Sequence, residues 1–195
     1  MSNMVYIEDS GQFNLERANK LLAGIGGGEL LRNALYNALN RAGVKARKEA
    51  AAFASKEYMI SSSGFKKHVK EKYHIHYGGG KISGGVVSCE LSFAGSVIPL
   101  IEFRTRYSRD GGVNVSVKRG GGGNLDHAFI ASLGGTNVYE RLGKSRLPIE
   151  RKYGPSAAHM MMDEHVDEQM EKTVVDTFNS RIEHEITRLL NGWGG

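Results

Sequence analysis

The sequence predicts an α+β fold in which an antiparallel sheet of about four to five strands packs against long N- and C-terminal helices. Three observations support this prediction. A helical apolar stripe lies near the start, apolar and polar residues alternate in the middle, and a second helical stripe lies near the end. Consecutive strands joined by short turns favour an antiparallel meander, with helices covering its apolar face.

The first long helix is expected at 29–58, within a helical region that spans 29–72. Its apolar residues recur every three or four positions, as in an amphipathic helix: Leu31, Leu35, Ala38, Ala42, Ala46, Ala50 and Phe53. Arg41, Lys45 and Lys48 fall largely off that stripe, and the pattern favours a plain core helix over a ligand site. A short helix is expected at 13–23, within an N-terminal segment 1–28. Ser61–Ser63 predict the start of a short basic helix over 64–70.

Residues 73–142 are expected to form the sheet. Four segments alternate apolar and polar residues with a period of two, as half-buried strands do: 73–77, 87–93, 101–106 and 113–117. Glycine-rich runs, which are typical of turns, separate them. A fifth short strand is expected near 138–142.

A loop at 143–155 is expected to lead into a C-terminal helix at 156–192. Ser156 is a candidate N-cap, and apolar residues continue at helical spacing from Val166 to Leu189. Acidic residues crowd the early turns, while Arg181 and Arg188 lie late, as the helix dipole favours. The whole chain, residues 1–195, is predicted to be a single domain.

Composition narrows the class of protein. With one cysteine, Cys89, no intrachain disulfide can form, which fits a chain that folds in a reducing cytoplasm. The formal net charge of +5 is compatible with a polyanionic partner but does not require one. Residues 1–25 lack a basic start followed by an apolar run, so no signal peptide is expected. No stretch approaches the ~20 apolar residues of a membrane span, so no membrane partner is expected.

Segments that resemble catalytic or ligand sites each lack a required part. The run 143–145, Gly-Lys-Ser, resembles the end of a phosphate-binding loop, but Val138 stands where the motif needs its first glycine. His74 and His76 share one strand face, and two ligands are too few for a structural zinc site. Cys89 falls on an apolar strand face, where a buried thiol is more common than a nucleophile. We therefore expect no catalytic residues, no metal, no cofactor and no enzymatic activity.

Basic residues are the strongest remaining signal of a partner. They gather around the third predicted strand, the following glycine loop and the segment after it, where they could pair with DNA phosphates without reading sequence. The candidate DNA-facing residues are Arg104, Arg106, Lys118, Arg119 and Lys144. A solvated surface, or salt bridges to acidic neighbours in an assembly, is the alternative for each.

The segment Ala128–Met161 carries the most specific pattern in the chain. It begins with an AFIA strand, continues through VYERLG at 138–143, and ends with RLPIERKYGPS at 146–156. These residues resemble the phage minor tail protein Z family and its wider set of tail-completion proteins. The likeness covers nearly the whole chain, and its specific block is Arg146–Ser156. Those families often show a Gly-His pair before the Val-Tyr step, where this chain has Gly-Thr-Asn at 135–137.

The resemblance implies a structural virion protein of the tail, acting in tail completion at the head-proximal end, or neck, and in head–tail joining or DNA passage. It implies a homo-oligomeric ring, six-fold to match the tail, with tail terminator, tail tube or head-completion proteins as partners and the phage genome DNA as a further contact. It places the protein in the virion after assembly in the host cytoplasm. The alternative is a non-sequence-specific DNA-binding protein that acts without a ring.

The same resemblance selects a set of residues that we call the assembly motif. Its members are Arg141, Arg146, Leu147, Pro148, Ile149, Tyr153, Gly154, Pro155 and Ser156. Arg141 and Arg146 could hold the loop in place, contact a neighbouring subunit or face DNA.

Overall fold

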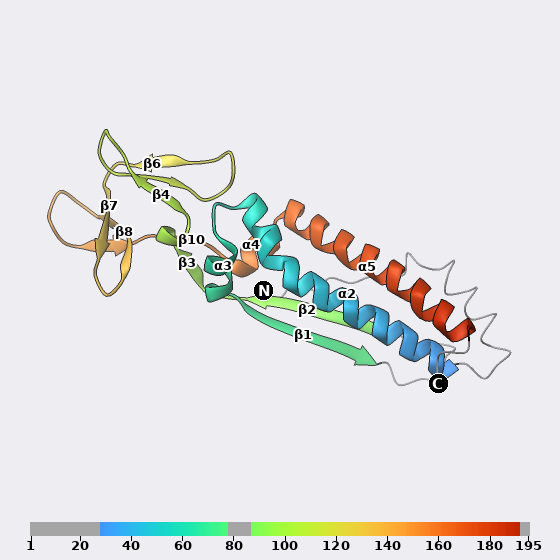
Figure 1. Cartoon of the computed structure of the whole chain (residues 1–195). Coiled ribbons are helices and arrows are strands. Elements are labelled where there is room, and N and C mark those ends of the chain that lie inside the picture. The colour runs from blue at the N-terminus through green and yellow to red at the C-terminus, as the bar shows by residue number, and fades with distance from the viewer. Residues whose placement is uncertain (1–27, 78–86, 192–195) are drawn as a thin grey trace. The chain divides into compact units, whose positions relative to one another are not determined.

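The computed structural model describes residues 28–77 and 87–191 (Figure 1). It contains α-helices and antiparallel sheets, so the α+β class is confirmed. The helix expected at 13–23 lies outside the described residues. The chain divides into two compact units, and each unit combines segments that are far apart in the sequence. The single domain over 1–195 stays a prediction.

The first unit, which we call the helical unit, contains residues 28–49, 71–77, 87–92 and 168–191. It takes most of two long helices, α2 (Gly28–Glu57) and α5 (Glu164–Leu190), and most of a two-stranded sheet of β1 (Lys70–Tyr77) and β2 (Val87–Ala94). α2 matches the helix predicted at 29–58. β1 and β2 contain the strands predicted at 73–77 and 87–93.

Small residues of α2 pack against large residues of α5 in this unit. Ala34, Ala38 and Leu35 of α2 form one cluster with Phe178, Ile182, Ile186 and Leu189 of α5. Ile182 is 2% exposed, and burying a side chain of this size stabilises a fold by about 1.5–3 kcal/mol. Gly43, further along α2, lies directly against Tyr73 of β1 and Cys89 of β2. The alanine and glycine positions of α2 therefore let its backbone approach its neighbours closely.

The second unit, which we call the sheet unit, contains Ala50–Lys70 and Phe93–Asp167. It has three small antiparallel sheets, in the orders β10-β3, β4-β5-β6 and β7-β8-β9. Their strands are β3 (Val97–Pro99), β4 (Arg104–Tyr107), β5 (Val113–Ser116), β6 (Gly123–Leu125), β7 (Ala128–Ser132), β8 (Thr136–Arg141), β9 (Ile149–Arg151) and β10 (Tyr153–Ser156). The fully buried side chains of this unit include Phe65, Ile98, Val113, Val138, Met160 and Val166.

The helix starts in this unit follow the predicted capping. α3 (Ser62–His68) begins after Ser61, whose hydroxyl accepts a hydrogen bond from the Gly64 N–H at 3.0 Å. α4 (Ala157–Met161) begins after Ser156, whose hydroxyl accepts from the His159 N–H at 3.2 Å. The helix start predicted at Ser61–Ser63 and the predicted N-cap Ser156 are confirmed, whereas α3 ends at His68 and not at residue 70.

The single sheet of four to five strands is wrong, because the described residues form four separate sheets of two or three strands. The loop predicted at 143–155 contains two of these strands, β9 and β10. The strand predicted at 101–106 is also partly wrong, since a 3-10 turn, η2 (Leu100–Glu102), precedes β4. Leu100 and Phe103 are both buried, and a spacing of three residues between buried positions suits a turn better than a strand.

The single C-terminal helix at 156–192 is wrong as well. α4 ends at Met161, and α5 begins only at Glu164. The Asp163 carboxylate accepts from the His165 N–H at 3.3 Å, while the Asp163 carbonyl accepts from the Asp167 N–H at 2.9 Å. Aspartate is a strong N-cap, so Asp163 starts a new helix where the sequence pattern suggested continuity.

Candidate functional site

The first half of the assembly motif forms a loop at one end of the β7-β8-β9 sheet. Arg141, the last residue of β8, pairs in register with Ile149, the first residue of β9. The Leu142 N–H donates to the Pro148 carbonyl at 3.2 Å and closes the loop, in which the Leu147–Pro148 peptide is cis. Ile149 is half-buried. The motif therefore builds a defined hairpin loop over 142–148.

This loop exposes apolar side chains beside a cation. Leu142 and Leu147 are 63% and 67% exposed, and Arg146 is exposed between them. Arg141 differs, because its guanidinium lies 4.8 Å from the centroid of the Phe129 ring on β7. A cation–π contact of this kind holds Arg141 to the sheet. Of the three roles expected for Arg141, this contact corresponds to holding the loop in place.

The second half of the motif has an architectural role. β10 pairs with β3, with Tyr153 opposite Pro99 and Ser156 opposite Val97. A Cβ on Gly154 would lie 2.6 Å from Cε2 of the buried Phe103 ring, so a side chain here requires that ring to move. Ser156 then caps α4. The fold of the chain itself therefore accounts for Gly154 and Ser156 at these positions, and neither residue requires a partner protein.

A site residue that sequence reasoning missed is Asn137 on β8. Its side chain is fully buried, and its Oδ1 accepts from the Ile101 N–H at 3.4 Å. Its Nδ2 donates to the Lys152 carbonyl at 3.5 Å. Asn137 stands within the Gly-Thr-Asn step where the resembled families often have Gly-His. No periodic pattern could reveal it, because three consecutive β8 residues from Asn137 onward are buried.

Two of the five candidate DNA-facing residues are engaged within the sheet unit. The Lys118 ammonium lies 2.6 Å from an Asp163 carboxylate oxygen, which also accepts from the Tyr58 hydroxyl at 3.1 Å. The hydrogen bond from Lys118 to Asp163 raises the pKa of Lys118 and lowers the pKa of Asp163. Arg119 donates to the Ser55 carbonyl at 2.9 Å. Lys118 therefore pairs with an acidic residue of its own chain, whereas the alternative expected from the sequence was a salt bridge within an assembly.

The other three candidates are exposed. None of them is hydrogen-bonded to Lys118 or Arg119. Arg104 and Arg106 alternate along β4 and so share one of its faces, opposite Ser116 and Asn114 of β5. Lys144 lies in the exposed loop after β8. Within the described part of the chain, no ion pair or hydrogen bond is recorded for these three side chains. They remain available to a partner.

The segments that resemble catalytic or ligand sites lack the structural surroundings that such sites need. The run 143–145 belongs to the exposed loop before β9, whereas a phosphate-binding loop leads into a helix. Cys89 is half-buried, and burial raises the pKa of its thiol against the lowering effect of the Tyr73 hydroxyl. Over residues 28–77 and 87–191, no group of three or more histidine, cysteine or acidic side chains could hold a metal ion.

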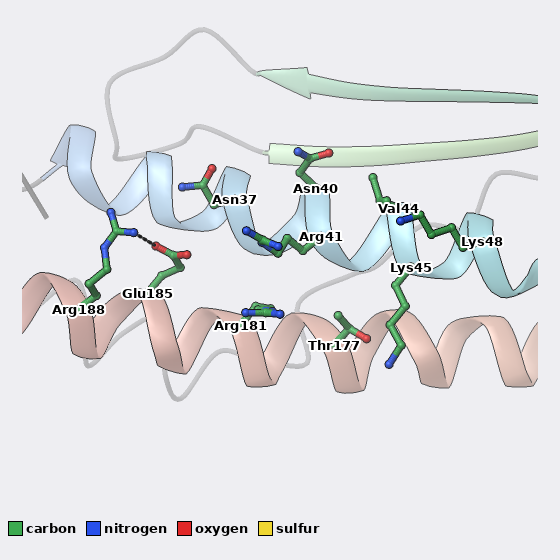
Figure 2. Close-up of a pocket in the computed structure, with 10 residues that line it drawn as sticks. All are labelled: Asn37, Asn40, Arg41, Val44, Lys45, Lys48, Thr177, Arg181, Glu185 and Arg188. Carbon is green, nitrogen blue, oxygen red and sulfur yellow. Dashed lines mark ion pairs between the residues drawn. The ribbon is translucent and has the colours of Figure 1, made fainter. Parts of the chain in front are cut away.

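A second feature that sequence reasoning missed is a cavity in the helical unit, between α2 and α5 (Figure 2). Its volume is about 540 Å³. We call this cavity the basic groove, because five cationic side chains line it: Arg41, Lys45, Lys48, Arg181 and Arg188. The signal was present in part, since Arg41, Lys45 and Lys48 recur at helical spacing on one face. Only folding brings α5 beside them.

Comparison of the chain with protein-family models, curated proteins and solved structures finds no match. No helix among the described residues is long and apolar enough to cross a bilayer. Proposals about function therefore depend on the residue pattern and the geometry of the chain itself.

Proposed function

We propose that the chain is a structural virion protein of a phage tail, which acts in tail completion at the neck and in head–tail joining or DNA passage. The observation that carries this proposal is the assembly motif. Its residues resemble the tail-completion pattern, and its first half lies on a hairpin loop that exposes two leucines, Leu142 and Leu147. The role is one of assembly, without catalysis.

The loop over 142–148 has the chemistry of a contact surface. Exposed apolar side chains gain free energy when a partner buries them, about 25 cal/mol for each Å² removed from water. Arg146 adds a planar donor, and arginine is enriched in protein interfaces. We assign the partner as a second copy of this chain, arranged head-to-tail so that the contact closes into a six-fold ring. Tail terminator, tail tube or head-completion proteins would bind the finished ring.

Mass measurement of purified protein tests this proposal. Size-exclusion chromatography with light scattering should give a ring mass for the wild-type chain and a monomer mass for Leu142→Ser/Leu147→Ser. The matched control is Leu133→Ser, because Leu133 is 54% exposed but lies in the turn between β7 and β8, at the other end of the same sheet. This control should retain the ring.

Two results would count against the proposal. One is a ring that Leu142→Ser/Leu147→Ser leaves intact. The other is a wild-type chain that stays monomeric both alone and with the tail proteins encoded beside it. The neighbouring reading frames give an independent check, because they should encode a tail tube protein, a tail terminator or a head-completion protein.

Non-sequence-specific DNA binding is the second candidate function, and the pair Arg104 and Arg106 favours it. Both side chains are exposed on one face of β4. We expect Arg104→Gln/Arg106→Gln to weaken duplex binding equally for all sequences and to reduce the salt slope by about 2, because two phosphate contacts are lost. Fluorescence anisotropy over a range of salt concentrations measures both effects. An unchanged slope would exclude this face as the DNA contact.

A further inference from the structure

The basic groove concentrates like charges that the helical unit does not neutralise. Its lining contains five cations and a single carboxylate, Glu185, which lies 3.8 Å from Arg188. For Arg41, Lys45, Lys48 and Arg181, no ion pair or hydrogen bond is recorded among the described residues. Like charges that share a concave surface raise its potential and attract counter-charges. An anionic ligand would relieve this repulsion.

The cations come from both helices and converge across the groove. Figure 2 shows Lys45 reaching from α2 toward α5, and Arg181 of α5 opposite Arg41 of α2. Two guanidinium groups can each donate two parallel hydrogen bonds to phosphate oxygens, while a lysine ammonium acts as a mobile point charge. This combination matches phosphate better than it matches a single carboxylate.

A buried hydroxyl provides a separate indication. Thr177 also lines the groove, and its Oγ1 is buried without a hydrogen-bond partner among the described residues. A threonine hydroxyl can donate one hydrogen bond, and leaving a buried polar group unpaired is unfavourable. Because Oγ1 is closed to solvent, a ligand oxygen in the groove could accept this bond only after the Thr177 side chain rotates. The rotated side chain would add a neutral donor to the cations of the site.

We propose that the basic groove binds a phosphate-rich ligand, with Arg41, Lys45 and Arg181 as its main phosphate contacts. The volume of about 540 Å³ accommodates several adjacent phosphates and lies within the usual range of ligand sites. These phosphates belong either to a nucleic-acid backbone or to a free oligophosphate. The inference does not depend on the tail-completion proposal, because the groove shares no residue with the assembly motif.

Binding measurements on the full chain test the groove. The first probe is a fluorescein-labelled 20-base-pair duplex of arbitrary sequence, followed by anisotropy, and the second is inorganic tripolyphosphate, followed by calorimetry. Arg41→Gln/Lys45→Gln/Lys48→Gln should weaken binding of the recognised probe by at least about tenfold near 0.1 M salt, since each lost phosphate contact lowers affinity strongly. Arg181→Gln, on the opposite helix, should weaken binding of the same probe.

The matched control removes the same net charge outside the groove. Arg32→Gln/Lys66→Gln/Lys172→Gln changes one residue each of α2, α3 and α5, none of which lines the cavity. This control should lower affinity by less than about threefold, through long-range electrostatics alone. Glutamine has a helix propensity close to those of lysine and arginine, so both triple variants should keep their helices.

Thermal denaturation without ligand distinguishes a binding role from a structural one. Cations kept for a ligand repel one another in its absence, so the groove variants should keep or raise the Tm. Selective loss of duplex binding would identify a nucleic-acid backbone as the source, and selective loss of tripolyphosphate binding would identify a free oligophosphate. Binding of neither probe by the wild-type chain, or equal weakening by the groove and control variants, would overturn the proposal.

Discussion

At the residue scale, Asn137 shows how a polar side chain can organise a small β unit. It is the only buried polar residue among those that the structure describes, and it joins the backbone of η2 to the backbone between β9 and β10. Buried polar groups are tolerated when they are hydrogen-bonded, and a satisfied pair of bonds fixes the relative positions of the segments. Asn137 therefore has a structural task that its sequence context did not reveal.

We expect Asn137→Ala to lower the free energy of unfolding by about 1–3 kcal/mol, because it leaves the Ile101 N–H and the Lys152 carbonyl without partners. Urea denaturation followed by circular dichroism measures the change. Asn114→Ala is the control, since Asn114 is exposed on β5, and a surface change of this kind alters stability by less than about 0.5 kcal/mol. Equal effects of the two changes would contradict the role given to Asn137.

Asp163 combines three functions in one side chain, since it caps α5, pairs with Lys118 and accepts from Tyr58. The Lys118 ammonium, followed by the Tyr58 hydroxyl, lowers the pKa of Asp163, against the effect of burial. A lowered carboxyl pKa contributes stability that is present above the ordinary value of about 4 and is lost as the pH falls through the lowered value.

We therefore expect the wild-type Tm to fall as the pH drops from about 5 to below 4, and Asp163→Asn to remove part of this fall. At pH 7 the same variant should be less stable than the wild-type chain, because the ion pair and the charged cap are lost. Scanning calorimetry at several pH values measures both effects. Asp176→Asn changes an exposed residue of α5 and should leave the fall in Tm at acid pH as it is in the wild-type chain. If Asp163→Asn kept the full wild-type fall, Asp163 would be excluded as a source of that fall.

At the element scale, α2 is adapted to close packing rather than to maximal helix propensity. Glycine in a helix interior costs about 1 kcal/mol relative to alanine. Gly43 is nevertheless buried in α2, where an added Cβ would contact the Tyr73 ring and would lie 2.7 Å from Cys89 Sγ. The Tyr73 hydroxyl also donates to the Asn40 carbonyl one turn earlier, at 3.3 Å. The glycine permits β1 and β2 to lie against the helix.

We expect Gly43→Ala to destabilise the chain by roughly 1–2 kcal/mol, because overpacking of about 1–3 kcal/mol exceeds the gain in helix propensity. Urea denaturation gives the value. Gly43→Ala/Cys89→Ala should lose less stability than the sum of its single changes, since removal of the sulfur relieves one close contact of the new methyl group, although those with Tyr73 stay. An increase in stability for Gly43→Ala would show that the sheet does not approach α2 this closely.

At the scale of the whole molecule, each compact unit contains a tyrosine whose neutral form is favoured by the fold. In the sheet unit, burial, followed by the Asp163 carboxylate, raises the pKa of Tyr58 to about 12. In the helical unit, burial, followed by the Cys89 thiol, raises the pKa of Tyr73. A raised pKa contributes stability that is complete below the ordinary tyrosine value of about 10 and is lost as the pH rises through the raised value.

Both units should therefore lose stability on the alkaline side, and for Tyr58 the loss should extend from pH 10 to about 12. Tyr58→Phe and Tyr73→Phe should each make the fall in Tm between pH 10 and 12 less steep. Tyrosinate absorbance and circular dichroism follow the ionisation and the unfolding together. Tyr107→Phe is the control, because Tyr107 is 68% exposed. This change should leave the fall in Tm between pH 10 and 12 as steep as in the wild-type chain. An equally steep fall in Tm between pH 10 and 12 in all three variants would exclude Tyr58 and Tyr73 as its cause.

The elements whose signals are local could be predicted from the sequence. The periodic stripe of α2, the alternation within β1, β2 and β5, and the serine caps of α3 and α4 depend on neighbouring residues, so each was predictable. The assembly motif was also predictable as a loop, although the sequence did not reveal that half of it forms β9 and β10.

Which distant segments meet depends on how the whole chain packs. The pairing of β10 with β3 and the hydrogen bond from Ile101 to the buried Asn137 both depend on partners tens of residues away. The basic groove is the clearest case, since the cations of α2 and α5 are more than a hundred positions apart and each set alone has the pattern of a solvated helix face. Periodicity records which face of an element is apolar, whereas the identity of the opposing element is set by packing over the whole chain.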